Sequence, residues 1–120
     1  MLPHERLDAW KLCNELSPRI DDITDTFPID EKYRLTSQMR RCALSAPTNI
    51  AEGVAKRGNE FQRFLNIALG LLNELGSLLD YARRRECLGA SNWKNLRKLR
   101  DRAGLVTWRL YQSQRRRGGK

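Results

Sequence analysis

The chain has 120 residues, of which 40% are hydrophobic and 31% are charged, and it carries a formal net charge of +9. A chain of this length forms one domain with a core of its own, and no apolar run approaches the roughly 18 residues that a membrane span needs. The N-terminus lacks the apolar segment of a secretory signal, and the three cysteines are widely spaced, so we expect a cytoplasmic protein with reduced thiols and no membrane contact.

The first predicted helix runs from Pro3 or His4 to about Thr26. Apolar residues recur there at spacings of three and four, which indicates a helix with one buried face. Pro18 lies inside this segment and is expected to kink it, because proline lacks a backbone donor. Carboxylates follow the proline, but no histidine lies near them to complete a metal site, so we expect a solvated acidic face. Its members are Asp21, Asp22 and Asp25.

The second predicted helix begins after Asp30, a residue type suited to the N-cap, and ends near Gly53. At about 100° per residue, an apolar stripe and a polar stripe lie side by side along it. The apolar stripe consists of Leu35, Met39, Cys42, Ala46 and Ile50. The polar stripe consists of Gln38, Arg41, Ser45, Asn49 and Glu52. Because buried polar groups need partners, this polar stripe predicts an edge that meets protein, either within one protomer or across a subunit boundary.

The third predicted helix begins at Asn59, which forms an N-x-x-Q capping pattern with Gln62, and it ends at residues 87–89. It has the widest apolar face of the chain. Gly70 and Gly76 interrupt the helix, and glycine at such positions often permits the close approach of another helix.

The fourth predicted helix is capped by Ser91 and carries a heptad series of apolar residues. This series consists of Leu96, Leu99, Ala103, Val106 and Leu110. Residues 112–120 lack an apolar anchor, and we expect a basic, disordered tail there. Strand signals are absent. The sequence therefore predicts an all-α, antiparallel up-down-up-down four-helix bundle over residues 1–111.

The positive charge is unevenly placed. Residues 1–82 have a balance of −2 and residues 83–120 a balance of +11. This asymmetry predicts an acidic partner, RNA or DNA, although a well-hydrated basic surface without a partner gives the same pattern. Trp93, Trp108 and Tyr111 lie in this region and would either stack on unpaired bases or pack into the bundle. The residues predicted to contact phosphates are Arg83, Arg84, Arg85, Lys94, Arg97, Lys98, Arg100, Arg102, Arg109, Arg115, Arg116 and Arg117.

Several motifs in the first two thirds of the chain are distinctive. They are Phe27-Pro28 with Tyr33, the run Leu35–Arg41, the run Ser45–Gly53 with its Asn-Ile-Ala-Glu-Gly ending, and Phe61 with Phe64-Leu65 and Ala68. From Leu7 to Ala82 the chain resembles the small bacterial proteins encoded by intervening sequences in large-subunit ribosomal RNA genes. The resemblance implies a four-helix bundle that assembles into a homo-oligomeric ring, a pentamer. It also implies kinship with accessory proteins of diversity-generating retroelements, basic rings that bind nucleic acid and a reverse transcriptase.

An enzyme is the least favoured class. The only histidine, His4, lies near a terminus, and Ser45 has no histidine at hand to act as a base. The sequence has no complete phosphate-binding loop and no metal-ligand spacing, so we predict no catalytic residue, no metal site and no cofactor. The function predicted is a non-enzymatic, ring-forming bundle that binds RNA or DNA with low sequence specificity. The alternative is an oligomeric scaffold that binds another protein.

Overall fold

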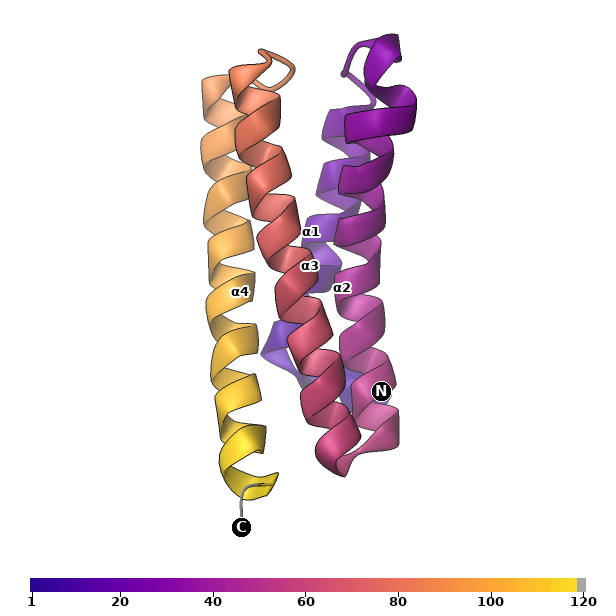
Figure 1. Ribbon diagram of the computed structural model, residues 1–120, viewed down its shortest axis with the longest axis vertical. Coiled ribbons are helices and arrows are strands. Elements are labelled where there is room, and N and C mark those ends of the chain that lie inside the picture. Colours follow the sequence, from indigo (N-terminus) through magenta and orange to yellow (C-terminus); the bar gives the residue numbers. More distant parts are fainter. Residues whose placement is uncertain (119–120) are drawn as a thin grey trace.

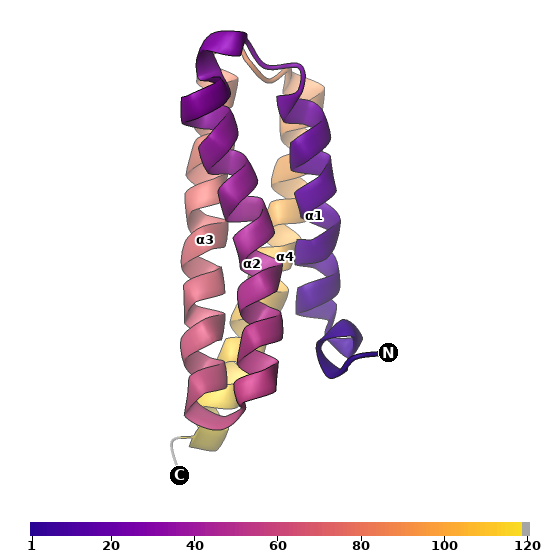
Figure 2. The same ribbon diagram turned by 90° about the vertical axis from the view of Figure 1, so that its right-hand side faces the viewer.

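The computed structural model describes residues 1–118, which form four long helices arranged up-down-up-down (Figure 1). The helices are α1 (Asp8–Thr24), α2 (Ser37–Lys56), α3 (Gly58–Arg84) and α4 (Ala90–Gly118). Helix α1 packs against α2 and α4, and α3 packs against the same two helices from the opposite corner (Figure 2). No β-strand occurs among these 118 residues. The predicted all-α four-helix bundle is therefore confirmed.

The N-terminal segment departs from the predicted continuous helix. Pro3–Arg6 forms a separate 3₁₀ turn, and the backbone becomes extended at Leu7, with φ −81° and ψ 127°, before α1 begins at Asp8. Pro18 does lie inside α1, at an exposed position. An exposed site tolerates the missing backbone donor, because water can hydrogen-bond to the carbonyl that the proline leaves without a partner.

The connection between α1 and α2 is also more structured than predicted. Asp30 does not cap α2 directly, because Ile29–Glu31 forms a 3₁₀ turn and Lys32–Thr36 a π-helical turn before α2 begins. These turns follow Pro28, whose fixed φ angle and missing N–H prevent the helical conformation of α1 from continuing through it. The turns cross the end of the bundle, where Figure 2 shows them arching from α1 to α2.

Two further predicted N-caps are wrong. Helix α3 begins at Gly58 rather than after Asn59, because the chain reverses direction at Arg57, which has φ 61° and ψ 176°. Helix α4 begins at Ala90, so Ser91 lies within its first turn. In both cases the first intrahelical hydrogen bond is accepted by the residue before the helix, Arg57 or Gly89, so the helix begins ahead of the residue with the best capping side chain.

The predicted disordered tail is helical where the structure describes it. Helix α4 continues through residues 112–118, and residues 112–114 are partly buried. A Cβ atom placed on Gly118 would meet the side chains of Asn59 and Gln62, so the end of α4 lies beside the beginning of α3. This neighbour supplies the contacts that the tail's own sequence lacks. Residues 119 and 120, also predicted to be disordered, lie outside the described residues.

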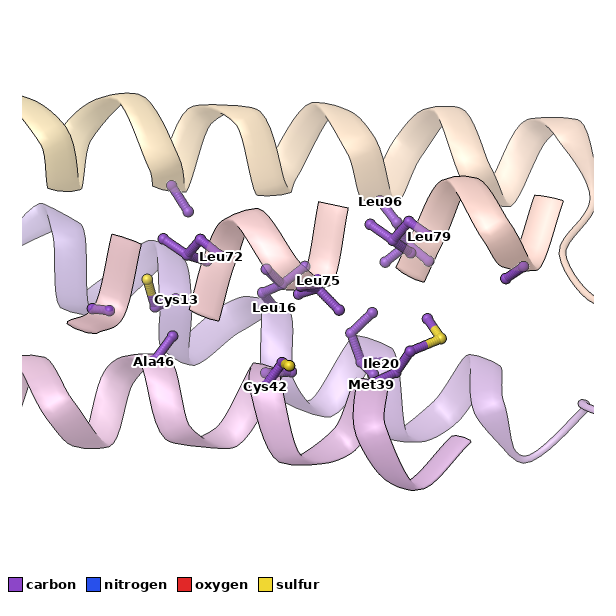
Figure 3. Packing of buried hydrophobic residues seen from close by; sticks show 14 of the residues in the cluster. Cys13, Leu16, Ile20, Met39, Cys42, Ala46, Leu72, Leu75, Leu79 and Leu96 are labelled. Carbon is purple, nitrogen blue, oxygen red and sulfur yellow. The ribbon is translucent and has the colours of Figure 1, made fainter. Parts of the chain in front are cut away.

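The core contains side chains from all four helices. Leu16 of α1, Met39 of α2, Leu75 of α3 and Leu96 of α4 point into the space between the helices (Figure 3). The whole apolar stripe of α2 is buried, as predicted. In the heptad series of α4, Leu96 and Ala103 are buried and the other three residues are partly buried.

Two glycines have different surroundings. At Gly53, near the end of α2, an added Cβ would lie 2.8 Å from Cβ of Phe64 and 3.0 Å from Cδ1 of Phe61. Gly53 therefore allows α2 and α3 to approach closely just before the chain turns from one to the other. Gly70 is exposed, and an added Cβ there would have no neighbour within 4 Å. The predicted close helix approach at Gly70 is therefore wrong.

None of the helices in the described part of the chain is both long and apolar enough to cross a bilayer.

Candidate nucleic-acid interface

The twelve basic residues predicted to contact phosphates divide into two groups. Two of them, Arg97 and Arg100, are partly buried. The other ten are exposed, and none forms an ion pair with a carboxylate of residues 1–118. These ten residues, called here the exposed basic surface, are Arg83, Arg84, Arg85, Lys94, Lys98, Arg102, Arg109, Arg115, Arg116 and Arg117.

Arg97 and Arg100 hold α4 against α3 instead of facing solvent. Nη1 of Arg97 donates a 3.2 Å hydrogen bond to the carbonyl of Gly76 and lies 3.7 Å from a carboxylate oxygen of Asp80. Nη1 of Arg100 donates a 3.1 Å hydrogen bond to the carbonyl of Leu72. Gly76 leaves space for this contact, since an added Cβ would lie 2.8 Å from Nη1 of Arg97. The glycine thus accommodates a guanidinium group rather than a second backbone.

Asp101 is the one acidic residue in α4, and its charge is already paired. A carboxylate oxygen of Asp101 lies 2.8 Å from Arg100 and 3.4 Å from Arg97. The field of the exposed basic surface is therefore not weakened by an unpaired carboxylate on the same helix.

Four members of the exposed basic surface line up along α4. Their spacings of four, seven and seven residues place them within an arc of about 40° on the helix, at 100° per residue. With a rise of about 1.5 Å per residue, they span about 27 Å. This basic row consists of Lys98, Arg102, Arg109 and Arg116. A linear series of cations on one helix face can follow the backbone of a nucleic acid strand without reading its sequence.

The three aromatic residues near this surface have different environments. The indole N–H of Trp93 donates a 3.0 Å hydrogen bond to Asp80, and the ring is partly buried. Tyr111 is also partly buried and packs against the core. Trp108 is 50% exposed. Leu105, which the sequence did not single out, is 47% exposed beside it. Leu105 could have been recognised from the sequence, because it lies three residues before Trp108 and outside the heptad series that fills the core.

The polar stripe of α2 finds one partner on another helix. Nη2 of Arg41 lies 3.1 Å from a carboxylate oxygen of Glu74 on α3. The side-chain amide of Asn49 donates to the carbonyl of Ser45 in its own helix at 2.8 Å. No other member of the stripe bonds to another helix within residues 1–118. Within one protomer the stripe therefore makes a single bond between helices, and none of its members is among the described side chains that have a buried polar atom without a partner.

Candidate catalytic groups are not brought together. The ring of His4 packs edge-on against Trp10, with ring centroids 4.9 Å apart. Burial raises the pKa of Cys13 to about 11 and that of Cys42 to about 12, so both thiols stay protonated at neutral pH. Residues 1–118 contain no group of three or more His, Cys, Asp or Glu side chains that could hold a metal ion.

Comparisons with known proteins agree with this architecture. A family model described as 23S rRNA-intervening sequence protein matches residues 5–106. A crystal structure from Bacteroides thetaiotaomicron, described as a protein with unknown function from the S23 ribosomal protein family, is similar in fold, with a TM-score of 0.80. The two sequences are 20% identical, and the match covers 87% of this chain and 95% of that one. No curated protein matches the chain.

Proposed function

Because the chain belongs to the 23S rRNA-intervening sequence protein family, we propose that it is a non-enzymatic helical bundle that binds RNA or DNA with low sequence specificity. The observation that carries this proposal is the exposed basic surface. It presents ten cationic side chains without a carboxylate partner among residues 1–118, while the one acidic residue of α4 is paired. A surface of this kind attracts polyanions and speeds their encounter with the protein.

The chemistry of the surface also explains the low specificity. Lysine and arginine on one helix face contact phosphates, which are the same in every sequence. The affinity then comes mainly from the counterions that leave the phosphates when the protein binds. The affinity therefore falls steeply as the salt concentration rises. An interface that reads bases needs side chains placed against base edges in a groove, and no arrangement of that kind defines this surface.

A salt series with the wild-type protein tests the proposal. We expect RNA and DNA to be retained at low salt, and we expect the logarithm of the association constant to fall by about 0.7 for each contacted phosphate of a single strand per tenfold increase in salt. Four contacts along the basic row would give a slope near −3. Fluorescence anisotropy with labelled homopolymers measures this slope. The proposal fails if nothing is retained at low salt, or if retention does not change with salt.

We further propose that the bundle assembles with copies of itself, as a ring of five. Half-buried Ser45 and Asn49, which lack partners on another helix of the same protomer, support this proposal. Leu44 on the outer side of α2 is 62% exposed, and an exposed leucine beside half-buried polar groups that bond to no other helix fits a subunit contact. If the protein does not bind nucleic acid, the alternative function is that of a ring-shaped scaffold that binds another protein.

Light scattering tests the assembly. The wild-type mass is expected to be about five times the 14.0 kDa of one chain. Leu44→Arg is expected to release monomers, because a charge would be buried in the contact. Arg41→Ala separates the roles of the polar stripe: an unchanged mass assigns Arg41 to its pair with Glu74 inside the protomer. A monomeric wild-type protein would rule out the ring.

A further inference from the structure

We propose that Trp108, with Leu105 beside it, is a platform on which one unpaired base stacks, so that the protein prefers single-stranded RNA or DNA to a duplex. The inference rests on the proposed nucleic-acid-binding function and adds the class of substrate. It starts from two apolar side chains that the fold leaves in solvent on its most basic helix.

Both side chains lie outside the packing of the bundle. Leu105 is 47% exposed and Trp108 is 50% exposed. The core side of α4 is formed by the helix positions of Leu96, Ala103 and Thr107, which are buried. At about 100° per residue, Leu105 projects from the opposite side and Trp108 from the flank, about 120° from the centre of the core positions, and their spacing of three residues makes them neighbours. The pair therefore does not help to close the core.

The surroundings of Trp108 leave its ring accessible. Side chains of an α-helix lean toward the N-terminus, so the indole extends toward the turn that contains Gly104. The Arg100 guanidinium lies beside this glycine, since an added Cβ there would be 3.5 Å from its Nη atoms, and half of the Trp108 side chain still remains exposed. The other two aromatic residues of the region are engaged elsewhere, since Trp93 donates its indole N–H to Asp80 and Tyr111 packs on the core. Trp108 is thus the aromatic residue of this surface that is available for stacking.

Charge decides which partner fits the pair. Arg102 lies three residues before Leu105 and Arg109 lies four residues after it, so two cations of the basic row stand one turn away on either side. Neither has a carboxylate partner among the described residues, and nearby Asp101 is held by Arg97 and Arg100. An apolar pair with an aromatic ring beside exposed guanidinium groups matches a strand whose phosphates and bases alternate along its length.

The nucleic acid must expose base faces to use this platform. In a duplex both faces of each base are covered by its neighbours, whereas in a single strand the bases can turn outward and stack on a side chain. Base–aromatic stacking contributes about tenfold to a hundredfold in affinity per base, enough to distinguish single strands from duplexes that make the same phosphate contacts. Two apolar side chains are also far fewer than the roughly 20–30 residues that each side of a standard protein interface contributes.

The experiment compares Trp108→Ala with wild type on a uridine homopolymer, a thymidine homopolymer and a duplex of equal length, all at one ionic strength. We expect Trp108→Ala to weaken single-strand binding by about tenfold to a hundredfold and to change duplex binding by less than about twofold. Trp108→Phe should restore most of the single-strand affinity, because phenylalanine also stacks. The salt dependence should stay the same in all three proteins, since no cation is removed.

Tryptophan fluorescence provides a second measurement. Single strands, but not duplexes, should quench the emission of wild type, and this quenching should be lost in Trp108→Phe and retained in the matched control Trp93→Phe. Circular dichroism verifies that each variant is folded. We expect the Trp108 variants to fold, because the side chain that is replaced is exposed.

Each remaining outcome contradicts the inference in a distinguishable way. If wild type binds single strands and Trp108→Ala binds them equally well, the platform is refuted while the proposed function stands. Equal losses for single strand and duplex would also refute it. If Trp108→Ala changes the mass in light scattering, the pair is a contact between copies of the chain. If wild type binds neither form of nucleic acid, the proposed function itself is refuted.

Discussion

Replacing all four residues of the basic row with glutamine is expected to lower the affinity for single-stranded RNA by about two to three orders of magnitude at about 0.1 M salt. The row lies on one face of α4, its members are exposed, and none has a carboxylate partner within residues 1–118. Glutamine keeps the length and the helix propensity of these positions while removing the charge. The slope of the logarithm of the association constant against the logarithm of the salt concentration should become less negative by about 3, because each of the four lost phosphate contacts contributes about 0.7 to it.

A matched control separates this surface from the net charge of the protein. Two lysines and two arginines outside α4 are exposed and also form no ion pair with a carboxylate of residues 1–118, and their replacement by glutamine changes the net charge by the same amount. The control residues are Arg6, Lys11, Lys32 and Arg57. We expect the control to weaken binding by less than about tenfold. Equal losses for the two sets of four would mean that overall charge, rather than the face of α4, determines binding.

The composition of the basic surface was largely predictable from sequence, and its exact membership was not. The excess of positive charge in residues 83–120 is visible in the printed chain, and ten of the twelve residues are exposed as that excess suggests. Arg97 and Arg100 differ because each reaches a carbonyl on α3. Such a contact depends on the register between two helices and on Gly76 at the crossing point, neither of which helical periodicity within α4 determines.

The fold shows the same division between what periodicity determines and what tertiary contacts decide. The apolar spacing of each helix predicted the four-helix bundle, because burial of one face per helix requires such a packing. The turns over residues 29–36 and the reversal at Arg57 were missed, since they depend on how the chain must pass from one helix to the next. The helical end of α4 was missed for a related reason: Asn59 and Gln62 beside it belong to another helix.

Opposite effects on stability are expected when two helical glycines are each replaced by alanine. Gly53→Ala should lower the free energy of unfolding by about 1–3 kcal/mol, because the new methyl group would lie 2.8 Å from Cβ of Phe64. That carbon is fixed to the backbone of α3, so relief requires the two helices to move apart. Gly70→Ala should raise the free energy of unfolding by up to about 1 kcal/mol, because alanine favours the helix and the added Cβ there meets no atom within 4 Å.

Urea unfolding followed by circular dichroism measures both changes, and the pair controls for helix propensity. Alanine gains the same intrinsic helix preference at both positions, so the difference between the two variants isolates the contact of Gly53 with Phe61 and Phe64. Stabilisation by both substitutions would show that the seam between α2 and α3 has room for a methyl group. The Asn-Ile-Ala-Glu-Gly run would then end in glycine for a reason other than packing. Destabilisation by Gly53→Ala alone would instead make this glycine the residue that sets the separation of α2 and α3 where they meet.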